Sequence, residues 1–517
     1  MRPALTAVLA ACVALAPLAA AARAGPASAV ATPQATAADA AAFDRATATV
    51  LERMRVVAAT PGAAPAMAVV MVRRGQPPVI WTHGHLSTEA GAAPADADTP
   101  FYIASQTKAF MGLLAVRLDA EGMFDLDQTL AEVWPDLTLP APADPAVITF
   151  RDLLSHQGPF ETPALSYRTA YVDLVPAADY GRLMAEGSQG REPGFRYSNL
   201  GYLVYSAALE LTTGRDWRDW LDQALFQPAG MTRSGARASR FDGIPLYHRW
   251  MGERGWDAFE GKPDDLMHAA GGLVMSPNDM ARWLSIQLGE AAGGLDPAWV
   301  RETQSLAVAA DIRGDGVPCQ GYGLGWNLCR IGAVDVRAHG GGYTGMRSAM
   351  AVSPDLGVGF AFFSNSDSLT GGLGQMMVQT FFETVQSAEP PAMTLETFGQ
   401  QYGERLARFA AQRMQAVEAR RAEAQWAGWT WRPSPADRAA YVGTYRHATL
   451  GDLAVVTQGE AVQARMGVVT RPLEPAAPDL FGITDGLADP PSPVRFERAD
   501  GRVTAVVWDA ERFERLP

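Results

Sequence analysis

The chain has 517 residues, of which 48% are hydrophobic and 19% charged, so it can bury a large core and is not a disordered protein. Its formal net charge of −13 excludes an extended phosphate-binding surface, and no nucleic-acid partner is expected. Lys108 and Lys262 are the only lysines in a chain rich in arginine. Because a desolvated lysine can lose its proton and an arginine cannot, both positions are candidates for chemistry.

The first 29 residues have the pattern of a secretory signal sequence. Arg2 precedes an apolar Ala/Leu/Val stretch, and small-residue cleavage sites follow at Ala24 and Ala29. A membrane anchor is the weaker alternative, because the apolar run is shorter than the ~20 residues that a span requires. Cys12 lies in a lipoprotein-like box that comes very early, so lipidation is not expected. We expect a periplasmic or extracellular protein with no transmembrane span in its mature chain.

Once the signal is removed, the chain keeps two cysteines, Cys319 and Cys329. An even number in an oxidising compartment is compatible with a disulfide. The segment between them has the composition of one strand, however, and ten extended residues would separate the Cα atoms by ~30 Å, against the ~5.5 Å of a bridge. Two free thiols are therefore expected, unless the chain folds back between them.

Residues 30–38 are a low-complexity stretch, and the elements predicted after it alternate between strand-rich ends and a helical middle. Helices are expected over Phe43–Val57, Ser105–Glu121, Asn199–Thr213, Asp216–Leu225, Pro277–Leu288 and Gly374–Thr384. Strands are expected over Ala68–Arg73, Val79–His85, Tyr322–Ile331, Val334–His339, Ser348–Val352 and Val358–Ser364. This order predicts an α/β (α+β) domain, residues 39–388, in which both chain ends build one antiparallel sheet beside a mostly helical lobe.

The remaining sequence changes character twice. Residues 389–434 begin with Glu389-Pro390-Pro391, a linker, and continue as an amphipathic connecting helix with apolar residues at spacings of three and four. Residues 435–517 consist of short strand-like runs separated by turns, which predicts a small antiparallel β-barrel.

Ser105 and Lys108 form the first chemical motif, Ser-x-x-Lys, at the start of a predicted helix. A serine hydroxyl needs an adjacent base to act as a nucleophile, and residues three apart on a helix share one face. Burial would lower the pKa of Lys108 and allow it to accept a proton. The alternative is a helix-capping serine followed by a surface lysine.

Two further motifs follow in the chain. Tyr197-Ser198-Asn199 offers a phenol that can shuttle protons and an amide that can bond both Lys108 and a substrate carbonyl; alone, it could equally be a helix cap. His339-Gly340-Gly341-Gly342 ends a predicted strand, where the glycines allow close approach of a substrate backbone. The N–H of Gly342 could stabilise an oxyanion, as could that of Ser105. The alternative for this motif is a glycine-rich turn with a surface histidine.

These three motifs, in this order, resemble those of the β-lactamase and penicillin-binding-protein superfamily, and most closely the class C β-lactamase-related (peptidase S12-type) serine hydrolases. The segments TPFYIASQTKAF, DLLSH, FRYSNLGY, YGLGW and HGGGYTG are similar to family segments in the same order. The resemblance implies that Ser105 is the acylated nucleophile, Lys108 its activating partner and Tyr197 the general base and leaving-group acid. It also implies that Asn199 orients the substrate. The tail resembles the lipocalin-like domains appended to some family members.

The third motif departs from the family at His339, where many members have a lysine that attracts a substrate carboxylate. A histidine is mostly neutral above its reference pKa of ~6.5, so this attraction is largely lost at neutral pH. Esters, amides or peptides without a carboxylate at that end are therefore the expected small-molecule substrates, ahead of β-lactams and D-alanyl-D-alanine peptides.

Other chemistry finds little support in the sequence. No GxSxG, HExxH or CxxC pattern occurs, so no metal and no cofactor is expected. The alternative from another class is a non-catalytic, penicillin-binding-like sensor or binding protein.

Overall fold

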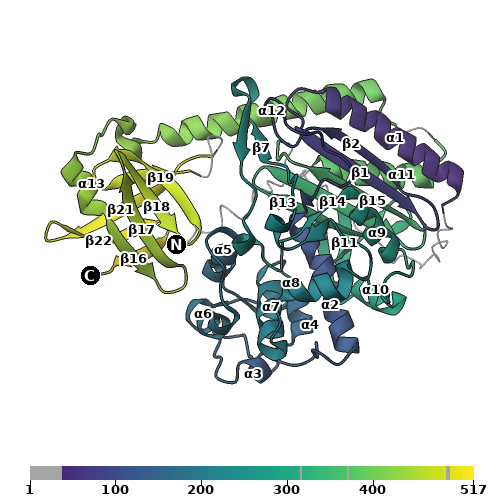
Figure 1. The fold of residues 1–517 in the computed structure, drawn as a ribbon, viewed down its shortest axis with the longest axis horizontal. Coiled ribbons are helices and arrows are strands. Elements are labelled where there is room, and N and C mark those ends of the chain that lie inside the picture. The colour runs from purple at the N-terminus through teal and green to yellow at the C-terminus, as the bar shows by residue number, and fades with distance from the viewer. Residues whose placement is uncertain (1–37, 315–316, 369–371, 390–391, 485–488) are drawn as a thin grey trace, which may run out of the picture.

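The centre of the structure is an eight-stranded antiparallel sheet (Figure 1). The computed structural model describes residues 38–314, 317–368, 372–389, 392–484 and 489–517. The expected signal sequence, including Cys12, lies outside this part of the chain. In spatial order the strands of the sheet are β10 (Val308–Gly314), β11 (Val317–Tyr322), β12 (Asn327–Ile331), β13 (Val334–Tyr343), β14 (Met346–Ser353), β15 (Val358–Ser364), β1 (Ala66–Arg73) and β2 (Val79–Gly84).

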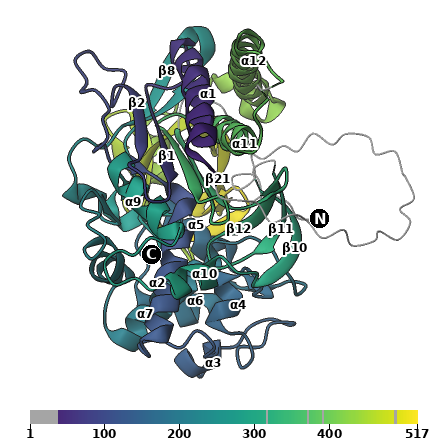
Figure 2. The ribbon, with the colours of Figure 1, turned by 90° about the vertical axis from the view of Figure 1, so that its right-hand side faces the viewer.

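Both ends of residues 39–388 contribute to this sheet, as the sequence predicted. Strand β1 pairs with β15 in the register Val70↔Ala361, although almost 300 residues separate them. The side chains of β1 alternate between two cores: Met67 and Val69 face one, Ala68 and Val70 the other. The first core is covered by α1 (Ala40–Ala59), α11 (Leu373–Gln386) and part of α12 (Leu395–Arg421), which lie together in Figure 2. The predicted α/β class is confirmed.

The other face of the sheet carries the helical lobe. Its helices are α2 (Thr107–Ala120), α3 (Leu130–Val133), α4 (Phe150–Leu154), α5 (Pro163–Tyr171), α6 (Tyr180–Gly187), α7 (Leu200–Thr213), α8 (Trp217–Leu221), α9 (Pro277–Gln287) and α10 (Pro297–Thr303). Short strands lie between them: β3 (Phe101–Tyr102), β4 (Phe160–Glu161), β5 (Gln189–Gly190), β6 (Ser234–Gly235), β7 (Tyr247–Trp250), β8 (Trp256–Phe259) and β9 (Val274–Met275). None of the helices within the described residues is long and apolar enough to cross a bilayer.

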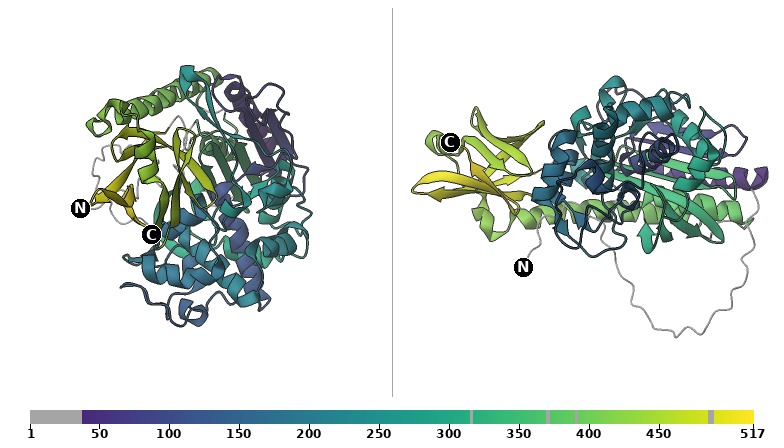
Figure 3. Two further views of the ribbon diagram at one scale, coloured as in Figure 1. Left: turned by 60° about the vertical axis from the view of Figure 1, so that its left-hand side comes forward. Right: turned by 90° about the horizontal axis from the view of Figure 1, so that it is seen from below.

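Helix α12 leaves the main sheet and leads to a closed antiparallel barrel (Figures 1 and 3). After α13 (Pro435–Tyr441), the barrel consists of β16 (Gly443–His447), β17 (Gly451–Gln458), β18 (Ala461–Met466), β19 (Val469–Ala477), β20 (Leu480–Ile483), β21 (Ser492–Ala499), β22 (Arg502–Trp508) and β23 (Glu511–Arg515). Pairing of β16 with β23 closes it. Aromatic side chains such as Tyr445, Phe481 and Phe496 fill its interior.

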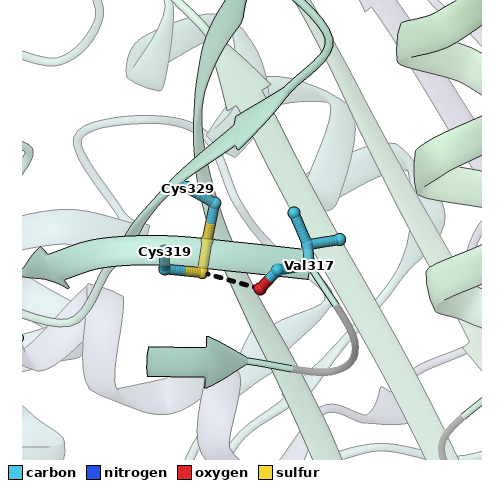
Figure 4. Close-up of a disulfide and its surroundings, with 3 residues drawn as sticks. All are labelled: Val317, Cys319 and Cys329. Carbon is cyan, nitrogen blue, oxygen red and sulfur yellow. Dashed lines mark hydrogen bonds between the residues drawn. A yellow bond between two sulfur atoms is a disulfide. The ribbon is translucent and has the colours of Figure 1, made fainter. Parts of the chain in front are cut away.

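The expectation of two free thiols was wrong. Cys319 and Cys329 form a disulfide, and they lie opposite each other on β11 and β12 (Figure 4). The segment between them is a hairpin instead of one strand, since the chain reverses between Tyr322 and Asn327, where Gly325 has a φ of +92°. A glycine adopts this conformation without steric cost. Gly325 was therefore the sequence feature that could have indicated the reversal.

Three further features of residues 39–388 differ from those expected. Strand β10 and helix α10 were not expected from the sequence, and β13 continues through His339 to Tyr343 instead of ending at the histidine. The glycines of the third motif are therefore part of a strand that pairs with β14 from Arg337 to Tyr343.

We expect the disulfide to be a measurable part of the stability of the chain. Replacing both cysteines with serine, in protein produced from residue 30 onward, should lower the free energy of unfolding by about 3 kcal/mol, because the unfolded chain regains the entropy of a closed loop of ~10 residues. Urea denaturation measures this change. Titration of unfolded, unreduced protein with a thiol reagent is the direct check, and two reactive thiols per chain would contradict the bridge.

Candidate active site

Ser105 lies in a single 3₁₀ turn (Ala104–Gln106) between β3 and α2. The residue before it, Ala104, has a φ of +47°, a left-handed conformation that costs a non-glycine residue roughly 1–2 kcal/mol. Thr107 holds the turn by donating its hydroxyl to the carbonyl of Ala104. The packed surroundings of β3 and α2 thus impose a strained backbone directly before the candidate nucleophile.

Lys108 is fully buried in the first turn of α2, and three oxygen atoms surround its amine. The Nζ atom lies 2.8 Å from Asn199 Oδ1, 2.7 Å from the carbonyl oxygen of Ala270 and 3.3 Å from Ser105 Oγ. Burial lowers the pKa of Lys108 well below its ordinary value of 10.5, because the charged form loses its hydration.

These contacts suit a neutral amine. A neutral amine has two N–H donors and one lone pair, whereas an ammonium has three donors. The oxygens of Asn199 and Ala270 can only accept, so they take the two N–H bonds. The remaining contact is Ser105 Oγ, which accepts the third N–H of an ammonium or donates its hydroxyl to the lone pair of a neutral amine. The site can therefore hold a base against the serine proton.

Tyr197 and Asn199 come to this centre from the segment before α7. The ring of Tyr197 lies 4.8 Å from Lys108 Nζ and 6.0 Å from the ring of His339, measured to the ring centroids, and its side chain is 44% exposed. Asn199 is the residue before the first turn of α7 and gives its oxygen to Lys108. The structure brings together the residues that the first two sequence motifs singled out.

The middle glycine of the third motif has a packing function. A Cβ on Gly341 would lie 2.1 Å from the carbonyl oxygen of Ile103 and 2.3 Å from Ser348 Oγ. The hydroxyl of Ser348 donates to the same carbonyl of Ile103 at 2.9 Å. Gly341 therefore lets the turn that carries Ser105 lie directly on β13. From the sequence, the glycines of this motif were expected only to let a substrate backbone approach.

The N–H of Gly342 points away from β14, to the other edge of β13. Tyr343 and Met346 close a two-residue turn and exchange backbone hydrogen bonds, so Gly342, one residue before, points its N–H to the other edge of β13. Within the described sheet, β12 pairs with β13 only as far as Ala338. The edge at Gly342 is thus available for an oxyanion or a substrate backbone.

His339 differs from its expected behaviour. The pKa of His339 is lowered to about 3, mainly by burial and secondly by the nearby Lys108. The ring is therefore neutral at every working pH instead of titrating near 6.5. Its Nδ1 lies 2.7 Å from the carbonyl oxygen of Gly340, which can only accept, so Nδ1 carries the proton. Nε2 then accepts from the hydroxyl of Tyr322 at 3.3 Å. Both ring nitrogens are engaged within the protein.

Sequence reasoning missed three parts of the site. The carbonyl of Ala270, which binds Lys108, leaves no signal in the sequence because every residue has a carbonyl. His156, in the DLLSH segment, accepts from the N–H of Ser198 at 3.2 Å and packs 4.5 Å from the ring of Tyr197. Tyr322, in the YGLGW segment, contacts both His156 and His339. Their presence in segments typical of the family was the available signal.

A metal site is a separate question. The described residues contain no cluster of three or more His, Cys, Asp or Glu side chains that could hold an ion. The polar groups of the site are instead an amine, a phenol, an amide and backbone N–H groups, which suit acyl transfer.

Comparison with known proteins identifies the family of the chain. The family model described as Beta-lactamase matches residues 45–374, more than half of the chain. The chain belongs to this family, whose members are serine hydrolases with the β-lactamase fold, and the resemblance inferred from the motifs is confirmed.

Individual relatives are distant. The chain is 25% identical to a protein of Aspergillus campestris named unguisins hydrolase, over 61% of either chain, so the match spans less than two thirds of that relative. Among solved structures, the octameric penicillin-binding protein homologue from Pyrococcus abyssi shares 18% identity, with a TM-score of 0.53 over 91% of this chain and 99% of that chain. A D-amino acid amidase from Ochrobactrum anthropi shares 22%, with a TM-score of 0.54 over 67% and 99%. At these identities the two structures show a shared fold.

The close approach at Gly341 leads to a prediction. Gly341→Ala should lower the melting temperature and the rate at which Ser105 is acylated, because the new Cβ displaces Ile103 and with it the turn that carries the serine. The matched control is Gly403→Ala in α12, where a Cβ meets nothing within 4 Å and alanine should be neutral or stabilise the helix by up to about 1 kcal/mol. Equal effects of the two substitutions would disprove the packing role.

Proposed function

We propose that the protein is a serine hydrolase that works through an acyl-enzyme on Ser105. The observation that carries the proposal is the buried amine of Lys108, held by two carbonyl oxygens and 3.3 Å from Ser105 Oγ. Such an amine is an adequate base for a hydroxyl that is a poor nucleophile by itself.

Each proton in the reaction has a carrier. Ser105 Oγ attacks the substrate carbonyl carbon and passes its proton to Lys108 Nζ, which takes the general-base role that the resemblance assigns to Tyr197. The N–H groups of Ser105 and Gly342 stabilise the oxyanion. As the carbon–oxygen or carbon–nitrogen bond breaks, Tyr197 gives its phenol proton to the leaving group and recovers one from Lys108. A water molecule then repeats the sequence against the acyl-enzyme, releasing the acid and returning the proton to Ser105.

The substrate class follows from His339. A neutral ring whose two nitrogens are engaged by Gly340 and Tyr322 offers no charge to a carboxylate. Esters, amides or peptides without a carboxylate at that end are therefore the proposed substrates. A true β-lactamase or a D-alanyl-D-alanine carboxypeptidase is the alternative. The names of two relatives, a hydrolase and an amidase, favour hydrolysis of an amide.

Secretion is part of the proposal. The disulfide supports an oxidising compartment, the periplasm or the extracellular space, because cytosolic thiols are kept reduced. We assign catalysis to residues 39–388, and residues 389–434 connect them to the barrel of residues 435–517.

Two substitutions test the nucleophile and its base. Ser105→Ala should abolish labelling by a fluorophosphonate probe, and Lys108→Arg should lower the labelling rate at least ~100-fold, because a guanidinium cannot accept the proton. Ser305→Ala, at an exposed serine, is the matched control and should label normally. A wild-type protein that is never labelled would favour a non-catalytic binding protein. Full activity of Lys108→Arg would reduce Lys108 to an electrostatic support.

The preference for uncharged substrates is tested with nitrocefin and p-nitrophenyl esters. The best ester or amide should exceed nitrocefin in kcat/KM by at least ~100-fold, about 2.7 kcal/mol of transition-state discrimination. His339→Lys should raise nitrocefin turnover without raising ester turnover. Lowering the pH from 8 to 5 should not have the same effect, since the pKa of His339 is about 3. Nitrocefin turnover equal to that of the best ester would restore the β-lactamase.

A further inference from the structure

The second lysine of the chain, Lys262, is also buried, and the proposed reaction does not use it. Its side chain lies between the end of α5 and the loop after β8, and the residue is only 5% exposed. Nζ donates to the carbonyl oxygen of Ala170 at 2.6 Å and lies 3.5 Å from that of Leu266. Ala170 belongs to the last turn of α5, where a cation is favoured by the helix dipole.

The remaining surroundings of the amine are aromatic. Lys262 Nζ lies 4.4 Å from the ring centroid of Tyr343 and 5.2 Å from that of Tyr171. The two rings stack on each other with an angle of 19° between their planes. A desolvated cation attracts the faces of nearby tyrosine rings, so Lys262 holds both rings in one orientation.

Tyr343 lies on the same face of β13 as the candidate site. Side chains two apart along a strand share a face, so Tyr343 follows His339 and Gly341 on the side that carries the Ser105 turn. It also packs against Tyr102, three residues before Ser105. Tyr171 and Tyr343 line a cavity that continues between the lobe and the barrel.

The direction of β13 decides which part of a substrate reaches this cavity. Tyr197, which protonates the leaving group in the proposed reaction, lies beside His339 with 6.0 Å between the two ring centroids, so the leaving group lies at the His339 end of β13. Tyr343 lies at the other end of the segment His339–Tyr343 of β13, directly after the oxyanion donor Gly342. The acyl part of a substrate therefore extends towards Tyr343.

We propose that Lys262 is a positioning residue, which fixes Tyr343 and Tyr171 as the wall of a pocket for an apolar or aromatic acyl group. The inference rests on the proposed serine hydrolase and names its acyl specificity. Lys262 acts through the two rings and makes no contact with the reacting atoms.

The pocket wall formed by Tyr343 and Tyr171 depends on pH, because Lys262 can lose its proton. Burial lowers the pKa of Lys262 to about 7, so the cation over the rings is present below that pH and lost above it. The groups that face it are Tyr343 from β13, Tyr171 from α5, Tyr247 from β7 and the buried His268, with Glu260 and Asp264 nearby on its own segment. Burial keeps His268 neutral and raises the pKa of Tyr247, so neither titrates near pH 7.

The test compares two esters with the same leaving group, p-nitrophenyl 4-phenylbutanoate and p-nitrophenyl acetate. Their ratio of kcat/KM isolates the acyl pocket, because the titration of Lys108 affects both and cancels. The wild-type ratio should fall as the pH rises from 6 to 8.5. Lys262→Met should lower the ratio at pH 6 at least fivefold, mainly through KM, and remove its pH dependence. Arg254→Met, at an exposed cation of the β7–β8 hairpin, should change neither.

Each outcome decides the inference. A Lys262→Met enzyme that keeps the wild-type ratio, or that loses both activities equally, would overturn it. If Lys262→Met does not fold, Tyr343→Leu must show the same loss of ratio and of pH dependence, and a normal ratio there would overturn it as well. Failure of a fluorophosphonate to label the wild-type serine would overturn the proposed function and this inference together. If the wild-type serine is labelled but Lys262→Met keeps the wild-type ratio, the inference alone is overturned.

Discussion

The burial of one amine, that of Lys108, is the interaction on which the rest of the site depends. An isolated charge is costly in an interior, and a neutral amine needs acceptors for its two N–H bonds. Those acceptors come from the segment before α7 and from the loop before β9. Since α2 brings the amine itself, the base exists only when these three segments of the helical lobe have come together.

A second constraint is the set of neutral groups beside the amine. His156 and His339 are both buried, and the pKa of each is lowered, in part by the charge that Lys108 would carry. Tyr322 joins them by contacts to both rings. Two neutral imidazoles thus lie next to the desolvated lysine, and the ring of His339 offers no charge to a carboxylate. The same burial that lowers the pKa of Lys108 thus also keeps His339 neutral.

Much of this could be predicted from the sequence, because the relevant signals are local. The spacing of Ser105 and Lys108 places both on one helical face, and the strand patterns at the two chain ends identify the sheet. Features that form only in the folded chain could not be recognised in the sequence. The hairpin between Cys319 and Cys329 resembles a single strand in composition, and its reversal depends on one left-handed glycine, Gly325.

The charge and hydrogen bonds of the site could not be derived from residue types. The side chain of His339 bonds the carbonyl of the next residue, which fixes its tautomer, and burial moves its pKa far from the reference value. Gly341 was assigned to the substrate because glycine permits close approach; the partner in that approach proved to be Ile103. The backbone oxygen of Ala270 is invisible to any reading of side chains.

The central claim is that burial holds the pKa of Lys108 well below its ordinary value of 10.5, and the composition of the chain makes this directly measurable. With two lysines in 517 residues, biosynthetic labelling with [ε-¹³C]lysine gives two carbon signals, which Lys108→Met assigns. The signal of Lys108 should titrate well below pH 10.5, or show the shift of a neutral amine throughout the range in which the protein is folded. A Lys108 signal that titrates near 10.5 would show an ordinary ammonium and contradict the account.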